Sequence, residues 1–113
     1  MALTLKNGRK TLKGLIKLES SFQNAVIRKL KKIKGIYFFK KEAAAIRSIP
    51  DVIGSYKGRF FGWELKRSSK SKPTPLQIYT LKQIQKAGGI GEVVYPENFE
   101  EKLEELLNSP NKE

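Results

Sequence analysis

The sequence has neither cysteine nor histidine, and these two absences narrow the chemistry that the chain can carry out. Without cysteine there is no disulfide framework and no thiolate zinc site. Without histidine, histidine general bases and histidine-metal nuclease motifs are excluded, so any metal ion must be held by oxygen atoms. No apolar run approaches the roughly eighteen residues of a membrane span, and the first residues lack the apolar core of a secretory signal. We therefore expect an intracellular protein of the cytoplasm or nucleoid.

Acidic residues are scarce in the first part of the chain. Residues 1–47 hold thirteen Lys or Arg against Glu19 and Glu42, whereas residues 97–113 are mostly acidic, and the net charge of the 113 residues is +12. This net charge predicts a polyanionic partner, for which nucleic acid is the first candidate and anionic lipid the second. No basic amphipathic helix with aromatic residues on its lipid side supports the membrane alternative. The length suits one domain, which we place at residues 18–113, after a basic N-terminal arm at residues 1–17 that contains the helix breaker Gly14.

Hydrophobic periodicity predicts an α/β fold, in which a small mixed β-sheet is flanked by helices. A helix is expected over residues 18–34 and a strand over residues 35–40. Two apolar runs around a turn at residues 56–59 indicate a hairpin. Thr74 is a helix cap with Pro75 at the first helical position. The buried side of that helix is predicted to consist of Leu76, Tyr79, Leu81, Ile84 and Ala87. A strand over residues 91–95 and a helix over residues 97–107 complete the order, and the last strand–helix–strand unit should be parallel.

The hairpin brings three charged residues together. Asp51 opens its first strand, and Glu64 and Lys66 close its second. Because side chains alternate along a strand, Glu64 and Lys66 share a face, and the hairpin returns them beside Asp51. Two adjacent carboxylates repel each other unless one is protonated or a cation lies between them, and oxygen ligands of this kind suit Mg²⁺. The alternative is a solvated strand edge, because Glu-x-Lys and Pro-Asp are each common on surfaces. The two pairs joined by one apolar hairpin favour the metal site.

Pro50-Asp51 followed by Glu64-Leu65-Lys66 resembles the motif of the PD-(D/E)xK nuclease superfamily. Gln77 after Thr74-Pro75-Leu76, and Ala87-Gly88-Gly89 before an apolar strand, resemble the stand-alone VRR-NUC nucleases, many of them viral, and the archaeal Holliday junction resolvases. The resemblance runs from Glu19 to about Tyr95. It implies a restriction-endonuclease-like core and a Mg²⁺-dependent endonuclease, with Mn²⁺ as a substitute, that cuts Holliday or other branched DNA junctions as a homodimer. The viral relatives are compatible with a virus-encoded protein that acts in its host cell.

The resemblance also implies roles for individual residues. The expected catalytic residues are Glu19, Asp51, Glu64, Lys66 and Gln77, and the expected metal site comprises Glu19, Asp51, Glu64 and Leu65. Lys66 would orient the attacking water, and Gln77 would support the water or the phosphate. The resemblance to the resolvases also implies that Arg47 or Ser48 lies near the scissile phosphate. From charge and position we expect DNA contacts from Arg9, Lys10, Arg28, Lys32, Arg67, Lys70 and Lys72.

A second function remains open from the residues. A basic nucleic-acid-binding module without catalysis explains the net charge equally well. The carboxylates discriminate between the two, because a pure binder gains nothing by placing Asp51 and Glu64 among its cations. The aromatic residues Phe60, Phe61 and Trp63 outnumber what one small core requires, which favours an interface between two copies.

Overall fold

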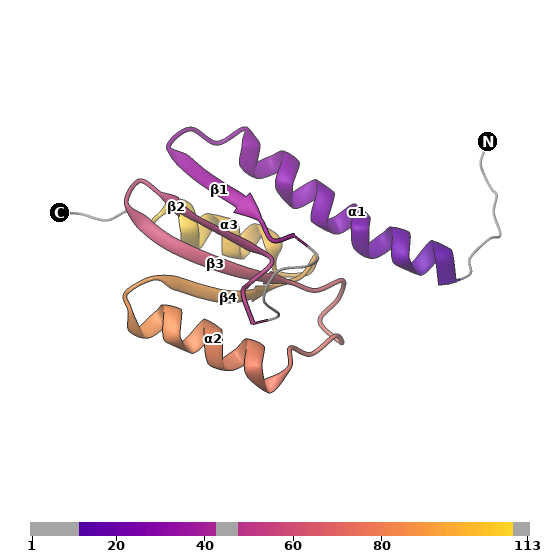
Figure 1. Cartoon of the computed structure of the whole chain (residues 1–113). Helices are drawn as coiled ribbons and strands as arrows, with labels where there is room; N and C mark the ends of the chain where they lie inside the picture. Colours follow the sequence, from indigo (N-terminus) through magenta and orange to yellow (C-terminus); the bar gives the residue numbers. More distant parts are fainter. Residues whose placement is uncertain (1–11, 43–47, 110–113) are drawn as a thin grey trace.

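A computed structural model describes the backbone of residues 12–42 and 48–109 and the side chains of residues 21–42 and 48–109. The element order is α1 (Leu12–Lys31), β1 (Ile36–Lys40), β2 (Val52–Tyr56), β3 (Arg59–Leu65), α2 (Pro75–Lys86), β4 (Ile90–Val94) and α3 (Phe99–Leu107) (Figure 1). The strands form one mixed sheet in the order β1-β2-β3-β4. β2 is antiparallel to both β1 and β3, and β3 and β4 are parallel, which confirms the α/β class and the parallel last unit.

The hairpin between β2 and β3 has a two-residue turn. Lys57 and Gly58 both adopt positive φ, at 46° and 91°, and two such residues are what a type I′ turn requires. These are the two central residues of the turn predicted at residues 56–59, which Tyr56 and Arg59 close by pairing with each other. A two-residue loop fixes the register, so that Val52 lies opposite Trp63. The hairpin prediction is confirmed.

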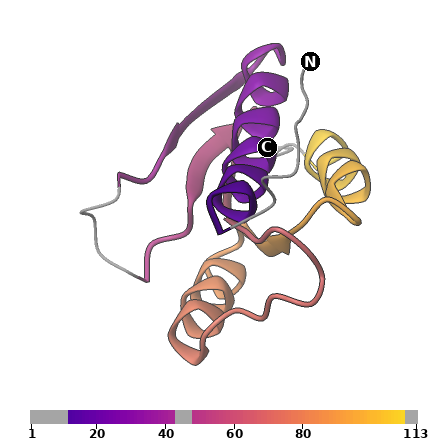
Figure 2. The same cartoon turned by 90° about the vertical axis from the view of Figure 1, so that its right-hand side faces the viewer.

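The helices cover the sheet unequally. Figure 2 shows α1 and α3 on one side of the sheet and α2 on the other. The core lies on the side of α1 and α3, where Val26 and Leu30 of α1 and Leu106 of α3 are fully buried with Phe61 and Trp63 of β3. On the opposite side, α2 packs so closely on β3 and β4 that a Cβ at Gly62 would lie 2.7 Å from Ile84 Cδ1 and one at Gly91 would lie 2.5 Å from the Leu81 carbonyl oxygen. Glycine at these two positions is what allows α2 to approach.

Two of the three aromatic residues that we assigned to an interface belong to the core. Phe61 and Trp63 are fully buried, and their rings meet edge to face with centroids 5.4 Å apart. The ring of Trp63 also meets that of Phe99 in α3 edge to face, with the ring centroids 6.1 Å apart. Only Phe60 is exposed, because neighbouring residues of a strand point to opposite faces. The apolar content of this segment is thus largely used within one chain.

The bounds of α1 differ from the prediction. The helix runs from Leu12 to Lys31 rather than over residues 18–34, and it crosses the boundary that we drew between arm and domain. Gly14 lies within the helix instead of breaking it, since one glycine costs only about 1 kcal/mol relative to alanine. The chain leaves the helix before Gly35, whose φ of 86° suits the turn into β1.

The buried side of α2 was also predicted wrongly in part. Leu81 is buried and Ile84 is half-buried, as expected, but Leu76, Tyr79 and Ala87 are exposed. The helix turns Leu81 and Ile84 toward the two glycines of the sheet, and Tyr79 therefore lies on its outer side.

Among the described residues, no helix is long and apolar enough to cross a membrane.

Candidate active site at the end of the hairpin

Asp51 and Glu64 lie side by side, as the hairpin predicted. The pairing of Val52 with Trp63 puts the preceding residue Asp51 opposite the following residue Glu64. The backbone N–H of Leu65 donates a hydrogen bond of 2.9 Å to Asp51 Oδ2, which fixes the aspartate against β3. The Leu65 side chain is buried in the core on the other face, so this strand end is held rigidly.

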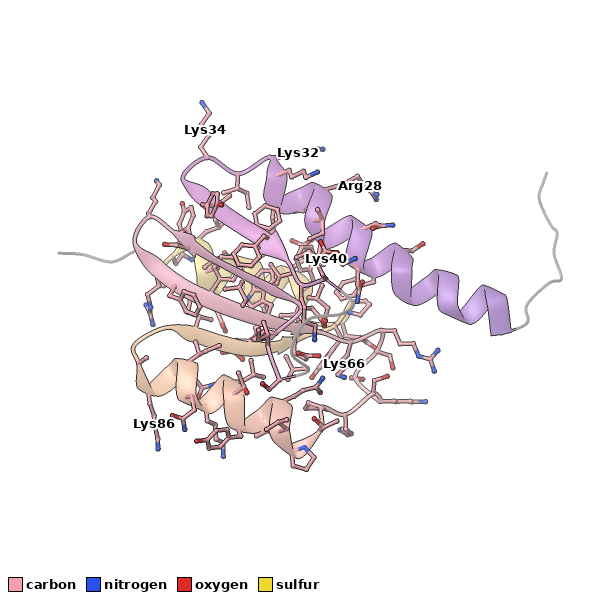
Figure 3. The ribbon with its side chains drawn as sticks, viewed as in Figure 1. Arg28, Lys32, Lys34, Lys40, Lys66 and Lys86 are labelled. Carbon is pink, nitrogen blue, oxygen red and sulfur yellow. The ribbon has the colours of Figure 1, made fainter. Side chains whose placement is uncertain are left out.

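Two lysines complete the charge arrangement. Lys66 Nζ lies 3.9 Å from Glu64 Oε2, and Lys41 Nζ lies 4.0 Å from Asp51 Oδ1. Lys41 follows β1, where its backbone N–H donates to the Asp51 carbonyl at 2.8 Å and so continues the pairing of β1 with β2. Figure 3 shows Lys66 between the sheet and α2, whereas Arg28 and Lys32 point outward from α1. Each carboxylate therefore has its own cation.

Gln77 reaches the same site from α2. Its Nε2 donates a hydrogen bond of 2.8 Å to Glu64 Oε2, and its Oε1 accepts one of 2.9 Å from the backbone N–H of Thr74. Thr74 in turn accepts from the Gln77 N–H, which makes a capping box at the start of α2. The Gln77 side chain thus caps the helix and orients Glu64. The cap engages the Gln77 Oε1 atom, and this leaves the Gln77 NH₂ group facing Glu64.

Glu64 is a buried acid with an unusual proton affinity. Only 3% of the residue is exposed. Burial raises the pKa of Glu64 from 4.5 to about 7, and the charge of Asp51 and a hydrogen bond with it also act to raise this pKa, while Lys66 and Lys41 partly oppose the rise. Near neutral pH, Glu64 therefore exists in both its protonated and its ionised form. A buried carboxylate with its pKa at the working pH is typical of functional sites.

The donor set fits a divalent cation. Mg²⁺ typically takes one or two carboxylates from a protein and keeps several waters. A cation between Asp51 and Glu64 would remove the repulsion that, after burial, raises the pKa of Glu64. Leu65 could contribute only its backbone carbonyl, since its side chain is apolar and buried. Within the part of the chain that the structure describes, no group of three acidic residues is close enough to hold a metal. Glu19 lies in α1, but its side chain is outside the described ones.

A cavity opens beside these residues. It has a volume of about 530 Å³ and is lined by Lys41, Thr74, Pro75, Leu76 and Gln77. Lys41 and Gln77 both contact the carboxylates, so the cavity adjoins the acidic pair. A phosphate group entering there would lie between the ammonium of Lys41 and the start of α2, whose first turn contains no acidic residue.

The predicted DNA-contacting residues that the structure describes belong to different elements. Arg28 and Lys32 are exposed on α1, and Arg67, Lys70 and Lys72 are exposed in the segment between β3 and α2. Ser48 is half-buried. Arg9, Lys10 and Arg47 lie outside the described residues. Lys41 was missed, although the rule of strand alternation that placed Lys66 beside Glu64 would have found it once β1 was paired with β2.

Comparison of the chain with protein-family models, with curated proteins and with solved structures finds no match.

Proposed function

We propose that this protein is a metal-dependent nuclease that hydrolyses phosphodiester bonds in DNA. The observation that carries the proposal is the buried Glu64, which is surrounded by Asp51, Lys66 and the Gln77 amide at one end of the sheet. Two carboxylates with a lysine on the same strand face provide ligands for a divalent cation and a cation for the phosphate. The net charge of +12 supports a polyanionic substrate.

Asp51 and Glu64 would hold Mg²⁺, with Mn²⁺ as a substitute, and Glu19 and the Leu65 carbonyl would complete its protein ligands. When bound, the cation supplies Lewis-acid polarisation of a phosphoryl oxygen. Lys66 orients the attacking water or stabilises charge on the phosphate. Gln77 keeps Glu64 in position through its hydrogen bond of 2.8 Å. Lys41 holds Asp51 and contributes positive charge at the cavity where the phosphate would lie.

The finer features of the proposal rest on the resemblance to junction resolvases. A homodimer would present two such sites to two strands of a branched DNA junction, and it would act inside a cell. The fold supplies a rigid sheet end for the ligands, which is the support that a precisely held site needs. A basic binder without catalysis is the alternative. The burial of Glu64 argues against it, because burying an acid among basic residues weakens rather than assists the binding of a polyanion.

The test is cleavage of labelled four-way junctions by the wild-type protein and by Asp51→Asn, with Mg²⁺ and with EDTA. We expect Mg²⁺-dependent cleavage by the wild type and none by the variant, whose DNA binding stays intact or becomes tighter because a negative charge facing phosphate is lost. Linear duplex and single-stranded DNA serve as comparison substrates. Absence of cleavage on every substrate with both Mg²⁺ and Mn²⁺, or an Asp51→Asn variant that cuts at the wild-type rate, would refute the proposal.

A further inference from the structure

Three large aromatic side chains are exposed on the sheet face that carries the candidate active site. Tyr37 and Phe39 of β1 and Phe60 of β3 are 76%, 55% and 45% exposed. α2 packs on the same face against β3 and β4, where Gly62 and Gly91 receive it. Exposed rings of this size are unfavourable in water unless something stacks on them. The core does not require them, because it is built from the side chains of the opposite face.

The strand register defines how the rings are arranged. Tyr37 pairs with Ser55, which pairs with Phe60, so these three residues form one row across the sheet. Phe39 pairs with Ile53, which pairs with Gly62, in the next row. The small Ser55 between Tyr37 and Phe60 leaves both rings standing above the surface. The result is a shallow aromatic platform on β1, β2 and β3.

This platform leads directly to the acidic pair. Tyr37, Phe39 and Lys41 are alternate residues of one extended segment, so they share a face, and the ammonium of Lys41 is 4.0 Å from Asp51. At about 3.3 Å per residue, Phe39 is roughly 7 Å and Tyr37 roughly 13 Å along the strand from Lys41. These separations correspond to one and two nucleotides of an extended strand, measured from a phosphate beside Lys41.

We propose that unpaired bases next to the scissile phosphate stack on Phe39 and Tyr37, so that the site takes single-stranded or locally opened nucleic acid. This inference rests on the proposed function for the position of the phosphate. Aromatic platforms flanked by cations are the usual means of binding single strands, because every base has a face that can stack. In a duplex the bases are stacked within the helix and cannot reach such a platform. A branched junction would therefore have to expose unpaired nucleotides at the site.

A second copy of the chain is the competing occupant, and the charge disfavours it. The net charge of +12 attracts the phosphates of a single strand but gives a second copy no attraction to this platform, so the proposed homodimer would use another surface. Lys41 lies on the same face as Phe39 and supplies positive charge at the end of the platform.

The experiment measures equilibrium binding of a fluorescent single strand and of a matched duplex, with EDTA present so that nothing is cut. The test variant is Tyr37→Ala/Phe39→Ala. The control is Tyr79→Ala, which removes a ring that is 60% exposed from the outer side of α2. Each stacked base is worth about 5- to 150-fold in affinity. We expect the double variant to bind the single strand at least tenfold more weakly and the duplex within about twofold of wild type, and the control to change neither.

A strand with abasic sites shows whether bases are what the rings contact. Wild-type protein should bind the abasic strand more weakly than the normal one, and the double variant should bind both alike. The inference would be overturned if the double variant lost as much affinity for the abasic strand as for the normal one, or if its affinity for the normal strand were unchanged. It would also be overturned if sedimentation showed that the double variant turns a dimer into a monomer while the monomer binds the strand as tightly as before. If no DNA is cut but the abasic comparison holds, the proposed catalysis fails while base stacking stands. If Asp51→Asn abolishes cleavage but the ring variant binds normally, only the stacking fails.

Discussion

Replacing Glu64 by glutamine should stabilise the metal-free protein at pH 8 and leave its stability unchanged at pH 4. Glutamine keeps the shape of the side chain, its oxygen can accept from Gln77 Nε2, and its NH₂ group can donate to Asp51 in place of the proton of a neutral Glu64. What the substitution removes is the need to ionise a buried acid. Active sites are often stabilised by changes that abolish their function, and this site should follow that pattern.

The magnitude follows from the pKa of Glu64. In the folded protein the pKa is about 7, against 4.5 as the ordinary value. Below pH 4.5 both states hold the proton, so the wild type carries no penalty. Between pH 4.5 and 7 the unfolded chain binds fewer protons than the folded one, so the stability of the wild type falls as pH rises. Above pH 7 the penalty is complete at about 3 kcal/mol, since one pKa unit corresponds to about 1.4 kcal/mol.

Urea unfolding from pH 4 to pH 8.5 in EDTA measures this directly. Glu64→Gln should match the wild type at pH 4 and exceed it by about 3 kcal/mol at pH 8. The matched control is Glu92→Gln, a strand glutamate whose carboxylate lies 3.2 Å from Lys102 Nζ, and it should bring no gain at pH 8. Added Mg²⁺ should stabilise the wild type and not Glu64→Gln. A Glu64→Gln variant that is less stable than wild type at pH 8 would show that the ion pair with Lys66 outweighs burial, and the reasoning would be refuted.

Two further predictions concern Lys66 and the basic surface. Lys66→Ala keeps both carboxylates, so it should bind DNA nearly as well as wild type when binding is measured with Ca²⁺ in place of Mg²⁺. In single-turnover assays it should cut at least about a hundredfold more slowly. Equal losses of binding and cleavage would show that Lys66 is one phosphate contact among many. If on the order of six cations contact phosphates, the logarithm of the binding constant should fall with the logarithm of salt concentration at a slope near −5. A slope close to zero in a salt titration would show that the basic face does not bind DNA.

The parts of the structure that sequence alone could predict are those that local chemistry fixes. The pair Lys57-Gly58 suits a two-residue turn, and that turn sets the register which places Asp51 beside Glu64. Thr74-Pro75 likewise marks the start of α2 through local chemistry, because the Thr74 cap and the fixed φ of Pro75 both act within one turn of the helix. The site geometry that depends on these two signals is therefore predictable from neighbouring residues along the chain.

The parts that sequence could not predict depend on how elements pack. Apolar spacing placed Leu76 and Tyr79 on the buried side of α2, but the helix docks through Leu81 and Ile84 on two glycines that carry no hydrophobic signal. Lys41 was missed because its position beside Asp51 depends on β1 pairing with β2, which is not a local property. Likewise, the exposure of Tyr37 and Phe39 depends on which face each helix covers.

The start of α2 connects the fold to the site, and this connection explains why Glu64 can stay buried. Gln77 serves the capping box and Glu64 with one amide group, so the glutamate is held by the same hydrogen bonds that begin the helix. The N-terminal end of a helix carries partial positive charge, and the first turn of α2 contains no acidic residue that would cancel it. The cavity therefore has positive character from α2 and Lys41 on its wall, while Asp51 and Glu64 lie behind with negative charge. A site with carboxylates for a cation and positive charge for an anion is compatible with the proposed binding of a phosphodiester together with a metal ion.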